Sequence, residues 1–168
     1  GVPNGFANAI QGTLLMVGIA TLGSLPLGLM TGIFLSELGK TSALANTVRF
    51  VLRVLSGVPS IVVGVFAYAV MVLPVFAIGE WVLKPKGFSA LAGSFALAVV
   101  MLPIISLSTE EALKLVPMHQ RLASAALGAN RFQTIFRVVV SAALPGITTG
   151  VLLAVARAAG ETAPLIFT

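Results

Sequence analysis

Four long stretches of this sequence contain no charged side chain, and they limit its fold more than any other feature. They cover residues 1–36, 54–79, 87–109 and 138–156. An α-helix needs about 20 predominantly apolar residues to cross the hydrocarbon core of a bilayer. Only 9% of the residues are charged, whereas an ordinary soluble domain has about 25%. The sequence therefore predicts an all-α, polytopic transmembrane bundle with spans near 9–34, 56–78, 88–109 and 144–167.

The basic residues between these spans predict how the chain is oriented in the membrane. The connections at 35–55 and 110–143 carry most of the Lys and Arg, whereas the connection at 79–87 carries only Lys84 and Lys86. Cytoplasmic loops of membrane proteins are enriched in Lys and Arg. We therefore expect the first and third connections to be cytoplasmic and both chain ends to be extracytoplasmic. These loops account for the net charge of +5, so no nucleic-acid partner is predicted.

Prolines and paired glycines recur within the predicted spans. A proline inside a helix removes a backbone donor and favours a kink, and two glycines one turn apart allow close contact between helices. Packing explains both patterns, although kinked spans with small residues also occur along transport paths. The prolines are Pro26, Pro74, Pro103 and Pro164, and the glycine pairs are Gly28 with Gly32 and Gly146 with Gly150.

The connection at 110–143 is long enough for two short helices. The alanine-rich run from Arg121 stops at Gly128, which can take the left-handed conformation that often ends a helix. Asn130 then offers an N-cap, with Gln133 placed for a capping box. An apolar stripe at helical spacing follows, which predicts an amphipathic helix at the membrane surface. It serves either as an anchor or as a docking element for a cytoplasmic protein. The stripe comprises Phe132, Ile135, Phe136, Val139, Val140 and Ala143.

Nothing in the sequence predicts enzymatic chemistry by this chain. The run Gly39-Lys40-Thr41 resembles the end of a phosphate-binding P-loop, but the pattern requires glycine where Phe34 stands. His119 has no obvious metal partner and is interpreted as a solvated loop histidine. Glu110 and Glu111 are explained by helix capping or by pairing with Lys114. The absence of cysteine excludes disulfides and thiolate metal sites, so no cofactor is predicted in this chain.

Two charges interrupt the last predicted span. By helix rise, Arg157 lies about 18 Å beyond Pro145, and a charge at such depth is costly unless it is paired or faces a polar cavity. Glu161 follows four residues later, so the two side chains share one helix face and can pair. They form either a neutralised structural pair or part of a polar path for a charged substrate. An arginine fork suits an oxyanion because it donates two parallel hydrogen bonds.

The long connection resembles the EAA loop of ABC-importer permeases. The resemblance rests on Leu122-Ala123-Ser124, Gly128-Ala129-Asn130 and Leu144-Pro145-Gly146-Ile147. It implies a type I ABC-importer permease fold in which the loop forms a cytoplasmic coupling helix docked on an ATPase. Leu122 replaces the name-giving glutamate of the family, and Ser141 stands where its first proline is usual. The implied coupling residues are Leu122, Ala123, Ser124, Ala126, Gly128, Ala129 and Asn130.

Three further segments resemble the permeases of phosphate importers. They are residues 56–62 (SGVPSIV), 109–113 (TEEAL) and 157–165 (RAAGETAPL). The last of these is more similar to the PstA-type permease than to its PstC-type paralogue. The resemblance implies that Arg157, Glu161 and Thr162 line the substrate path for inorganic phosphate. It also implies about six spans in a complete permease, so we expect one further span before residue 1 and one after residue 168.

The resemblance also implies the partners and the location. The implied partners are a homologous second permease of PstC type, a cytoplasmic ABC ATPase dimer that binds ATP and Mg²⁺, and a periplasmic or surface phosphate-binding protein. The implied location is the lipid bilayer of a bacterial inner membrane. Two alternatives stay open. One is a permease for another oxyanion, such as molybdate or sulfate. The other is a passive channel or structural membrane subunit that couples nothing to ATP.

Overall fold

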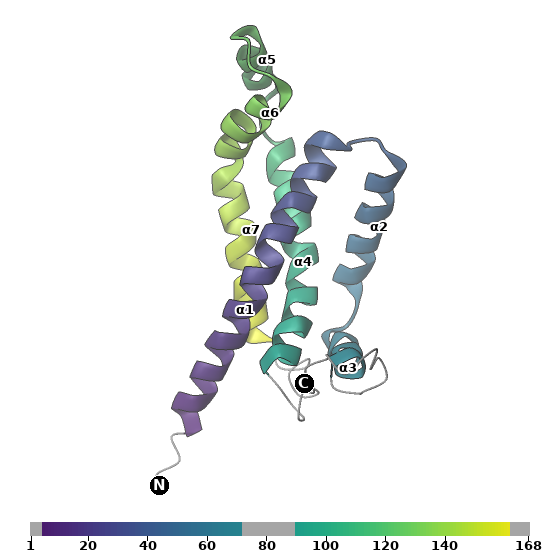
Figure 1. Cartoon of the computed structure of the whole chain (residues 1–168), viewed down its shortest axis with the longest axis vertical. Coiled ribbons are helices and arrows are strands. Elements are labelled where there is room, and N and C mark those ends of the chain that lie inside the picture. The colour runs from purple at the N-terminus through teal and green to yellow at the C-terminus, as the bar shows by residue number, and fades with distance from the viewer. Residues whose placement is uncertain (1–4, 72–89, 162–168) are drawn as a thin grey trace, which may run out of the picture.

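The computed structural model describes residues 5–71 and 90–161, and every regular element in these ranges is a helix (Figure 1). Two of the elements, η1 and η3, are π-helical turns. In chain order the elements are α1 (Gly5–Ile33), η1 (Phe34–Leu38), α2 (Ala43–Gly57), α3 (Ser60–Met71), α4 (Ala90–Lys114), α5 (Met118–Ala126), α6 (Arg131–Gln133), η3 (Thr134–Val139) and α7 (Val140–Gly160).

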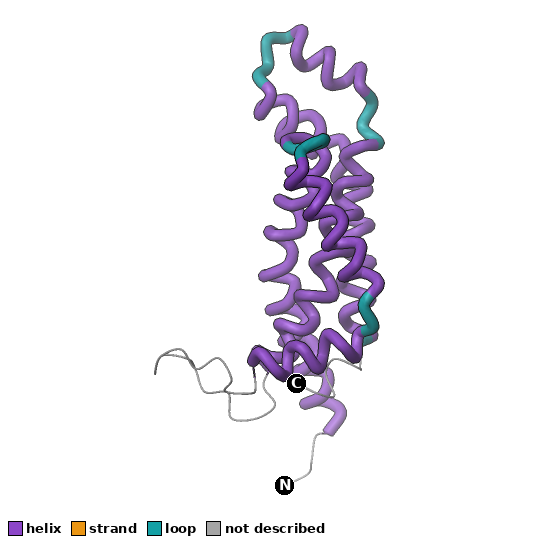
Figure 2. The backbone as a smooth tube through the Cα atoms, turned by 90° about the vertical axis from the view of Figure 1, so that its right-hand side faces the viewer, coloured by secondary structure: helices purple, strands orange, loops and turns teal. Residues whose placement is uncertain are grey.

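Helix α4 is the centre of the bundle. It packs against α1, α2, α3 and α7, and the two perpendicular views show the long helices running side by side (Figures 1 and 2). Helix α5 lies beyond one end of this bundle, which we call the α5 end. The chain enters α1 and leaves α7 at the opposite end.

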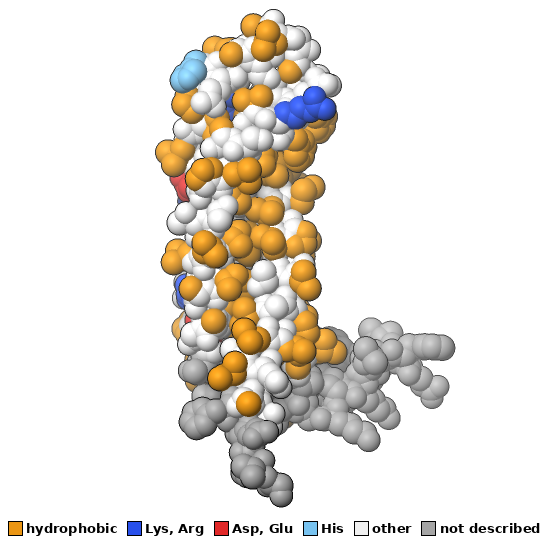
Figure 3. All heavy atoms as spheres, turned by 90° about the vertical axis from the view of Figure 1, so that its left-hand side faces the viewer, with side chains coloured by type: hydrophobic (Ala, Val, Ile, Leu, Met, Phe, Trp, Pro, Cys, Tyr) orange, Lys and Arg blue, Asp and Glu red, His pale blue; other side chains and the backbone are white. Residues whose placement is uncertain are grey.

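Three helical stretches in the described residues are long and apolar enough to cross a membrane. They are Ala7–Leu38, Ala90–Lys114 and Arg131–Gly160. Large apolar side chains are exposed along the bundle, and they cover much of one face (Figure 3). Soluble monomers rarely expose contiguous apolar patches of this extent. The surface is therefore that of a multi-pass membrane protein, as the charge-free stretches predict.

The two glycine pairs bring the outer helices close to α4 from two sides. A Cβ atom added to Gly32 would lie 2.5 Å from the Cβ of Thr109, and one added to Gly28 would lie 2.6 Å from Cγ2 of Ile105. On the other side, a Cβ atom at Gly150 would lie 2.4 Å from the Cβ of Ser108. Glycine is therefore required wherever α1 and α7 cross α4. The predicted role of these pairs in packing is confirmed.

The second predicted span, 56–78, falls across a sharp bend. Helices α2 and α3 meet at 106°, and together they are long and apolar enough for one broken span. The bend lies at Val58 and Pro59, where Val58 is extended (φ −71°, ψ 131°). A residue before proline is driven out of the helical region by the proline ring. Residues 72–78, including Pro74, lie outside the described residues.

The helix that contains the last predicted span, 144–167, begins earlier than predicted, and residues 162–167 lie outside the described residues. One helical stretch runs from Arg131 to Gly160, so the predicted surface helix forms its first turns and is not a separate element. Ile135, Val139 and Ala143 of the apolar stripe are buried, whereas Phe132 and Phe136 are 61% and 46% exposed. The apolar stripe is therefore only partly buried in the isolated chain, with Phe132 in α6 and Phe136 in η3 on the open side.

Several local predictions about helix ends are confirmed. Asn130 caps α6, its side chain accepts from the backbone N–H of Gln133, and the Gln133 side chain completes the capping box. Gly128 has a φ of +84°, in the left-handed region that L-residues with a Cβ avoid. Pro26 and Pro103 lie inside helices as predicted. Pro164 lies outside the described residues.

Substitution of Gly32 by Ala should destabilise the bundle by about 1–3 kcal/mol, because the added methyl group overpacks the contact with Thr109. Gly23→Ala in the same helix is the matched control. Nothing lies within 4 Å of a Cβ atom at that position, so this change should be neutral or slightly stabilising. Unfolding of the two purified variants in bicelles measures the difference, and equal stabilities would contradict the packing assigned to Gly32.

Candidate functional site

Charged side chains collect at two separate places in the described part of the chain. One is the C-terminal end of α7, where Arg157 lies in the last turn and Glu161 is the C-cap residue. The other is the α5 end, where the predicted coupling residues and two buried carboxylates lie. From Arg131, the continuous helical stretch of α6, η3 and α7 reaches Arg157 after about 39 Å at 1.5 Å per residue. The two predicted sites therefore lie at opposite ends of one helix.

Arg157 and Glu161 make the pair that their spacing predicts. Nε of Arg157 lies 3.4 Å from Oε1 of Glu161, and the two side chains are 49% and 16% exposed on the isolated chain. An exposed arginine on a spanning helix is too costly to face lipid. Because Arg157 lies in the last turn of α7, its guanidinium can meet the membrane interface, a polar cavity or another protein chain, but not the hydrocarbon core. Thr162, the third predicted path residue, lies outside the described residues.

The predicted coupling residues lie together at the α5 end, over α5 and the turn that leads to α6. Most of this segment is exposed: Leu122 is 62% and Leu127 90% exposed, and of the α5 residues only Ser124 is buried. The Ser124 hydroxyl lies 2.9 Å from that of Thr134 in η3. Helix α5 thus presents an apolar surface that the isolated chain does not cover. His119 on the same helix is exposed, as expected for a solvated histidine.

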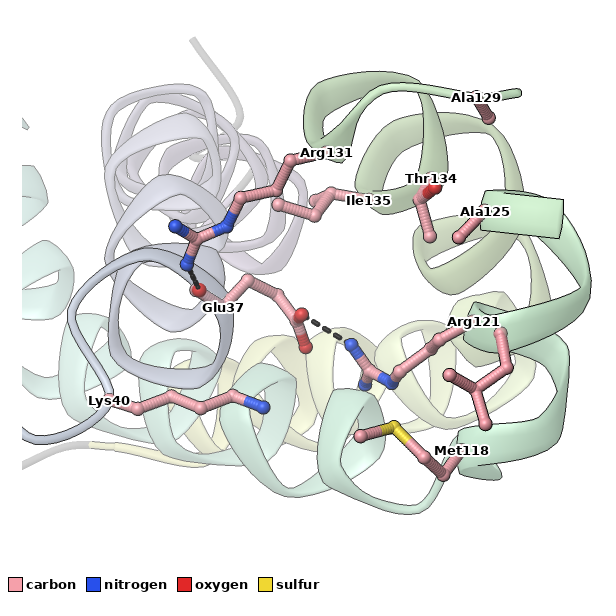
Figure 4. Close-up of a pocket in the computed structure, with 10 residues that line it drawn as sticks. Glu37, Lys40, Met118, Arg121, Ala125, Ala129, Arg131, Thr134 and Ile135 are labelled. Carbon is pink, nitrogen blue, oxygen red and sulfur yellow. Dashed lines mark hydrogen bonds and ion pairs between the residues drawn. The ribbon is translucent and has the colours of Figure 1, made fainter.

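Glu37 is a buried carboxylate that sequence reasoning missed. It lies in η1 at the end of the first span and is 5% exposed. Arg121 of α5 donates to its carboxylate, Ser36 donates to the same carboxylate at 2.9 Å, and Arg131 of α6 donates to its backbone carbonyl. Figure 4 shows Glu37, Arg121 and Arg131 converging from three elements. The sequence feature that could have indicated Glu37 is that it is the first charged residue after 36 uncharged residues.

Glu110 is the second buried carboxylate at this end, and it joins α4 to α2. Its side chain is 1% exposed and lies 2.7 Å from Nη2 of Arg49 and 2.9 Å from Nζ of Lys114. Glu111 is 67% exposed and lies 3.4 Å from Lys114. Pairing with Lys114 therefore accounts for both glutamates, as one of the two sequence interpretations had it. Helix capping does not, because α4 continues to Lys114.

An open groove of about 410 Å³ lies between η1 and the α5–α6 segment. Its rim carries one carboxylate and three cations, and the remaining lining is mostly apolar (Figure 4). Within residues 5–71 and 90–161, no cluster of three or more His, Asp or Glu side chains could hold a metal ion. The lining residues are Glu37, Lys40, Met118, Arg121, Leu122, Ala125, Ala129, Arg131, Thr134 and Ile135.

Comparison with known families and proteins places this arrangement among transport proteins. Residues 24–168 match the family described as "Binding-protein-dependent transport system inner membrane component". "Phosphate transport system permease protein PstA" of Yersinia pestis is 46% identical over 164 residues, 98% of this chain and 52% of the relative. The protein of the same name from Haemophilus influenzae is 43% identical, over 98% of this chain and 55% of the relative.

A third relative is less identical to this chain. "Probable phosphate transport system permease protein PstA" of Methanocaldococcus jannaschii is 38% identical over 98% of this chain and 54% of the relative. The chain thus spans about half the length of the curated relatives that it matches.

A solved structure shows the same fold. A chain of the MetNI methionine ABC transporter in an inward-facing conformation superposes with a TM-score of 0.67 and 22% sequence identity, over 89% of this chain and 66% of that chain. The predicted fold class, a transmembrane helical bundle of the ABC-importer permease type, is confirmed.

Replacement of Glu110 by Gln should destabilise the chain by about 3–5 kcal/mol, because it leaves the Arg49 guanidinium, 15% exposed, without its counter-charge. Glu111→Gln is the matched control and should change stability by less than about 1 kcal/mol, since exposed pairs contribute little. Unfolding of both variants in bicelles gives the two values. A Glu110 variant as stable as the Glu111 variant would contradict the role assigned to the buried pair.

Proposed function

The chain belongs to the family of binding-protein-dependent transport system inner membrane components, and we propose that it is the permease subunit of an ATP-driven phosphate importer. The observation that carries this proposal is the half-exposed Arg157–Glu161 pair near the end of a spanning helix. Charges in this position require a polar surrounding, which a translocation path between two permease subunits supplies. The names of the relatives, phosphate transport system permeases, support phosphate as the substrate.

The proposed substrate path runs past Arg157, Glu161 and Thr162. The planar fork of an arginine donates two parallel hydrogen bonds to an oxyanion. The Glu161 carboxylate repels a fully ionised anion but accepts a hydrogen bond from the hydroxyl of a protonated phosphate. Sulfate has no such hydroxyl at neutral pH. The pair therefore favours phosphate over sulfate.

The proposed docking element for the ATPase is α5 with the turn that follows it. Its exposed apolar surface, at Leu122 and Leu127, would be covered by a groove on the ATPase subunit. That separate subunit would bind ATP and Mg²⁺, and this chain would perform no hydrolysis. A homologous second permease of PstC type and a phosphate-binding protein complete the assembly. The α5 end then lies in the cytoplasm, and the end of α7 that bears Arg157 lies towards the outside.

Two other functions are less well supported. A permease for molybdate or sulfate would use the same arginine, but the relatives named for phosphate cover 98% of this chain. A passive channel or structural membrane subunit leaves the exposed apolar surface of α5 without a partner. Co-purification of an ATPase and a phosphate-binding protein with the full-length chain distinguishes the importer from both.

Glu161→Gln should lower the ratio of phosphate flux to sulfate flux at least about tenfold, since a tenfold change needs only about 1.4 kcal/mol, within reach of one hydrogen bond to a charged group. The measurement is competitive uptake of labelled anions into proteoliposomes that contain the assembled importer. Glu111→Gln, at an exposed glutamate of the α5 end, is the control and should keep the ratio of the unmodified protein. An unchanged ratio in the Glu161 variant would contradict the proposal that Glu161 favours phosphate over sulfate.

Ala126→Glu should uncouple hydrolysis from uptake, because a bulky charge on the exposed surface of α5 cannot enter an apolar groove without desolvation. Phosphate uptake should fall at least about tenfold, a penalty of about 1.4 kcal/mol in productive docking. ATP hydrolysis and uptake are measured on the same proteoliposomes. Ala126→Ser keeps the side chain small and should stay coupled, whereas full coupling in the Glu variant would refute docking through this surface.

A further inference from the structure

The α5 helix packs against η3 at the start of the last span, and its tie to the first span is made by its arginine. Helix α5 is nine residues long, and Ser124 is its only buried residue. The Ser124 hydroxyl reaches only η3, which follows closely along the chain. In the described part of the chain, Arg121 is the one α5 side chain that hydrogen-bonds to the first span or to α4, whereas Ser124 binds the start of the last span through Thr134. Any force applied to α5 must therefore reach the first span through very few groups.

Arg121 joins α5 to two spans at once. Its guanidinium donates from Nη1 to the carboxylate of Glu37 in η1, and from Nη2 to the backbone carbonyl of Leu113 at 3.0 Å. Leu113 lies in the last turn of α4, and its carbonyl also accepts from the backbone N–H of Val116 at 3.3 Å. Carbonyl groups at a helix C-terminus attract cations. One side chain thus binds the ends of both helices that meet beneath α5.

Glu37 also accepts a hydrogen bond from α6, which follows the turn after α5. Arg131, the first residue of α6, donates from Nη2 to the backbone carbonyl of Glu37. Ser36 holds the remaining carboxylate oxygen at 2.9 Å. The two arginines approach Glu37 from opposite ends of the α5–α6 segment, and in Figure 4 they enclose it. With both its carboxylate and its carbonyl bound, Glu37 fixes the whole segment to the end of the first span.

We propose that Glu37 is a positioning residue that transmits the motion of α5 to the first span. The inference rests on the proposed function, in which an ATPase moves α5. Helix α1 is pressed against α4 at Gly28 and Gly32, so a displacement received at η1 is carried along the α1–α4 contact towards the opposite end. Glu110 offers a natural comparison, because it is equally buried and paired but binds α2 and α4 without contacting α5.

The first experiment compares Glu37→Gln with Glu110→Gln in the assembled importer, reconstituted into proteoliposomes. Both variants lose a buried ion pair, so both lose stability. Only the Glu37 variant should lower the phosphate taken up per ATP hydrolysed, at least about fivefold, a change of about 1 kcal/mol in coupling. The Glu110 variant should change that ratio less than about twofold. Equal ratios in the two variants would overturn the inference and leave Glu37 a structural residue.

The reciprocal variant tests whether Arg121 acts through Glu37. Arg121→Gln should lower the same ratio, and the double variant Glu37→Gln with Arg121→Gln should fall no further than either single variant. Non-additivity of this kind is the signature of two residues that act in one interaction. If the fold-decrease of this ratio in the double variant equals the product of the two single fold-decreases, the two residues do not act through one interaction.

A spin-label measurement tests the tie independently of transport. The 168-residue sequence has no cysteine, so labels can be placed by Leu38→Cys in η1 and Met118→Cys in α5, which are 42% and 66% exposed. The full-length protein in lipid should give a narrow distance distribution, which Glu37→Gln broadens and Glu110→Gln does not. An unbroadened Glu37 variant would overturn the inference. Absence of phosphate uptake by the unsubstituted importer would instead refute the proposed function. The spin-label result would still show whether Glu37 holds α5 to the first span.

Discussion

The close approach of α1 and α7 to α4 at glycine is the contact on which the rest of the structure depends. Gly32 and Gly150 leave no room for a Cβ atom against Thr109 and Ser108, so the three helices pack almost backbone to backbone. In lipid, association between helices comes from such packing and from hydrogen bonds, because lipid chains are as apolar as the side chains that they contact. The crossings bring the end of the first span close to α4 and to the start of the last span.

The convergence of these helix ends explains why buried charge collects at the α5 end. Glu37 and Glu110 occupy the last turns of two spans and are neutralised by arginines from neighbouring elements. An unpaired charge at these positions would be strongly destabilising, whereas a paired and hydrogen-bonded charge is tolerated. The main effect of these ion pairs is therefore to determine which helices contact each other, and their net contribution to stability is small. One holds α2 against α4, and the other holds the α5–α6 segment against the first span.

Several parts of this arrangement could be predicted from local sequence. The capping box at Asn130 and the left-handed Gly128 depend on neighbouring residues only, and both were predicted. The Arg157–Glu161 pair follows from a spacing of four on one helix. By contrast, hydropathy alone does not register the bend at Val58 and Pro59 between α2 and α3. The burial of Ile135 and Val139 beside the exposed Phe132 and Phe136 was not predictable, because it depends on which helices pack against this segment.

The sequence by itself determined that the chain is embedded in lipid and that it folds into helices, since uncharged stretches of this length are stable only as spans in lipid. The family resemblance added the type of permease. Only the tertiary structure decided the partners of the buried charges: Glu37 and Arg121 are 84 residues apart, and Arg49 and Glu110 are 61 apart. Helical periodicity governs neighbours three or four residues away. Pairs so distant in sequence meet only because the helices pack side by side, and that packing is a property of the assembled bundle.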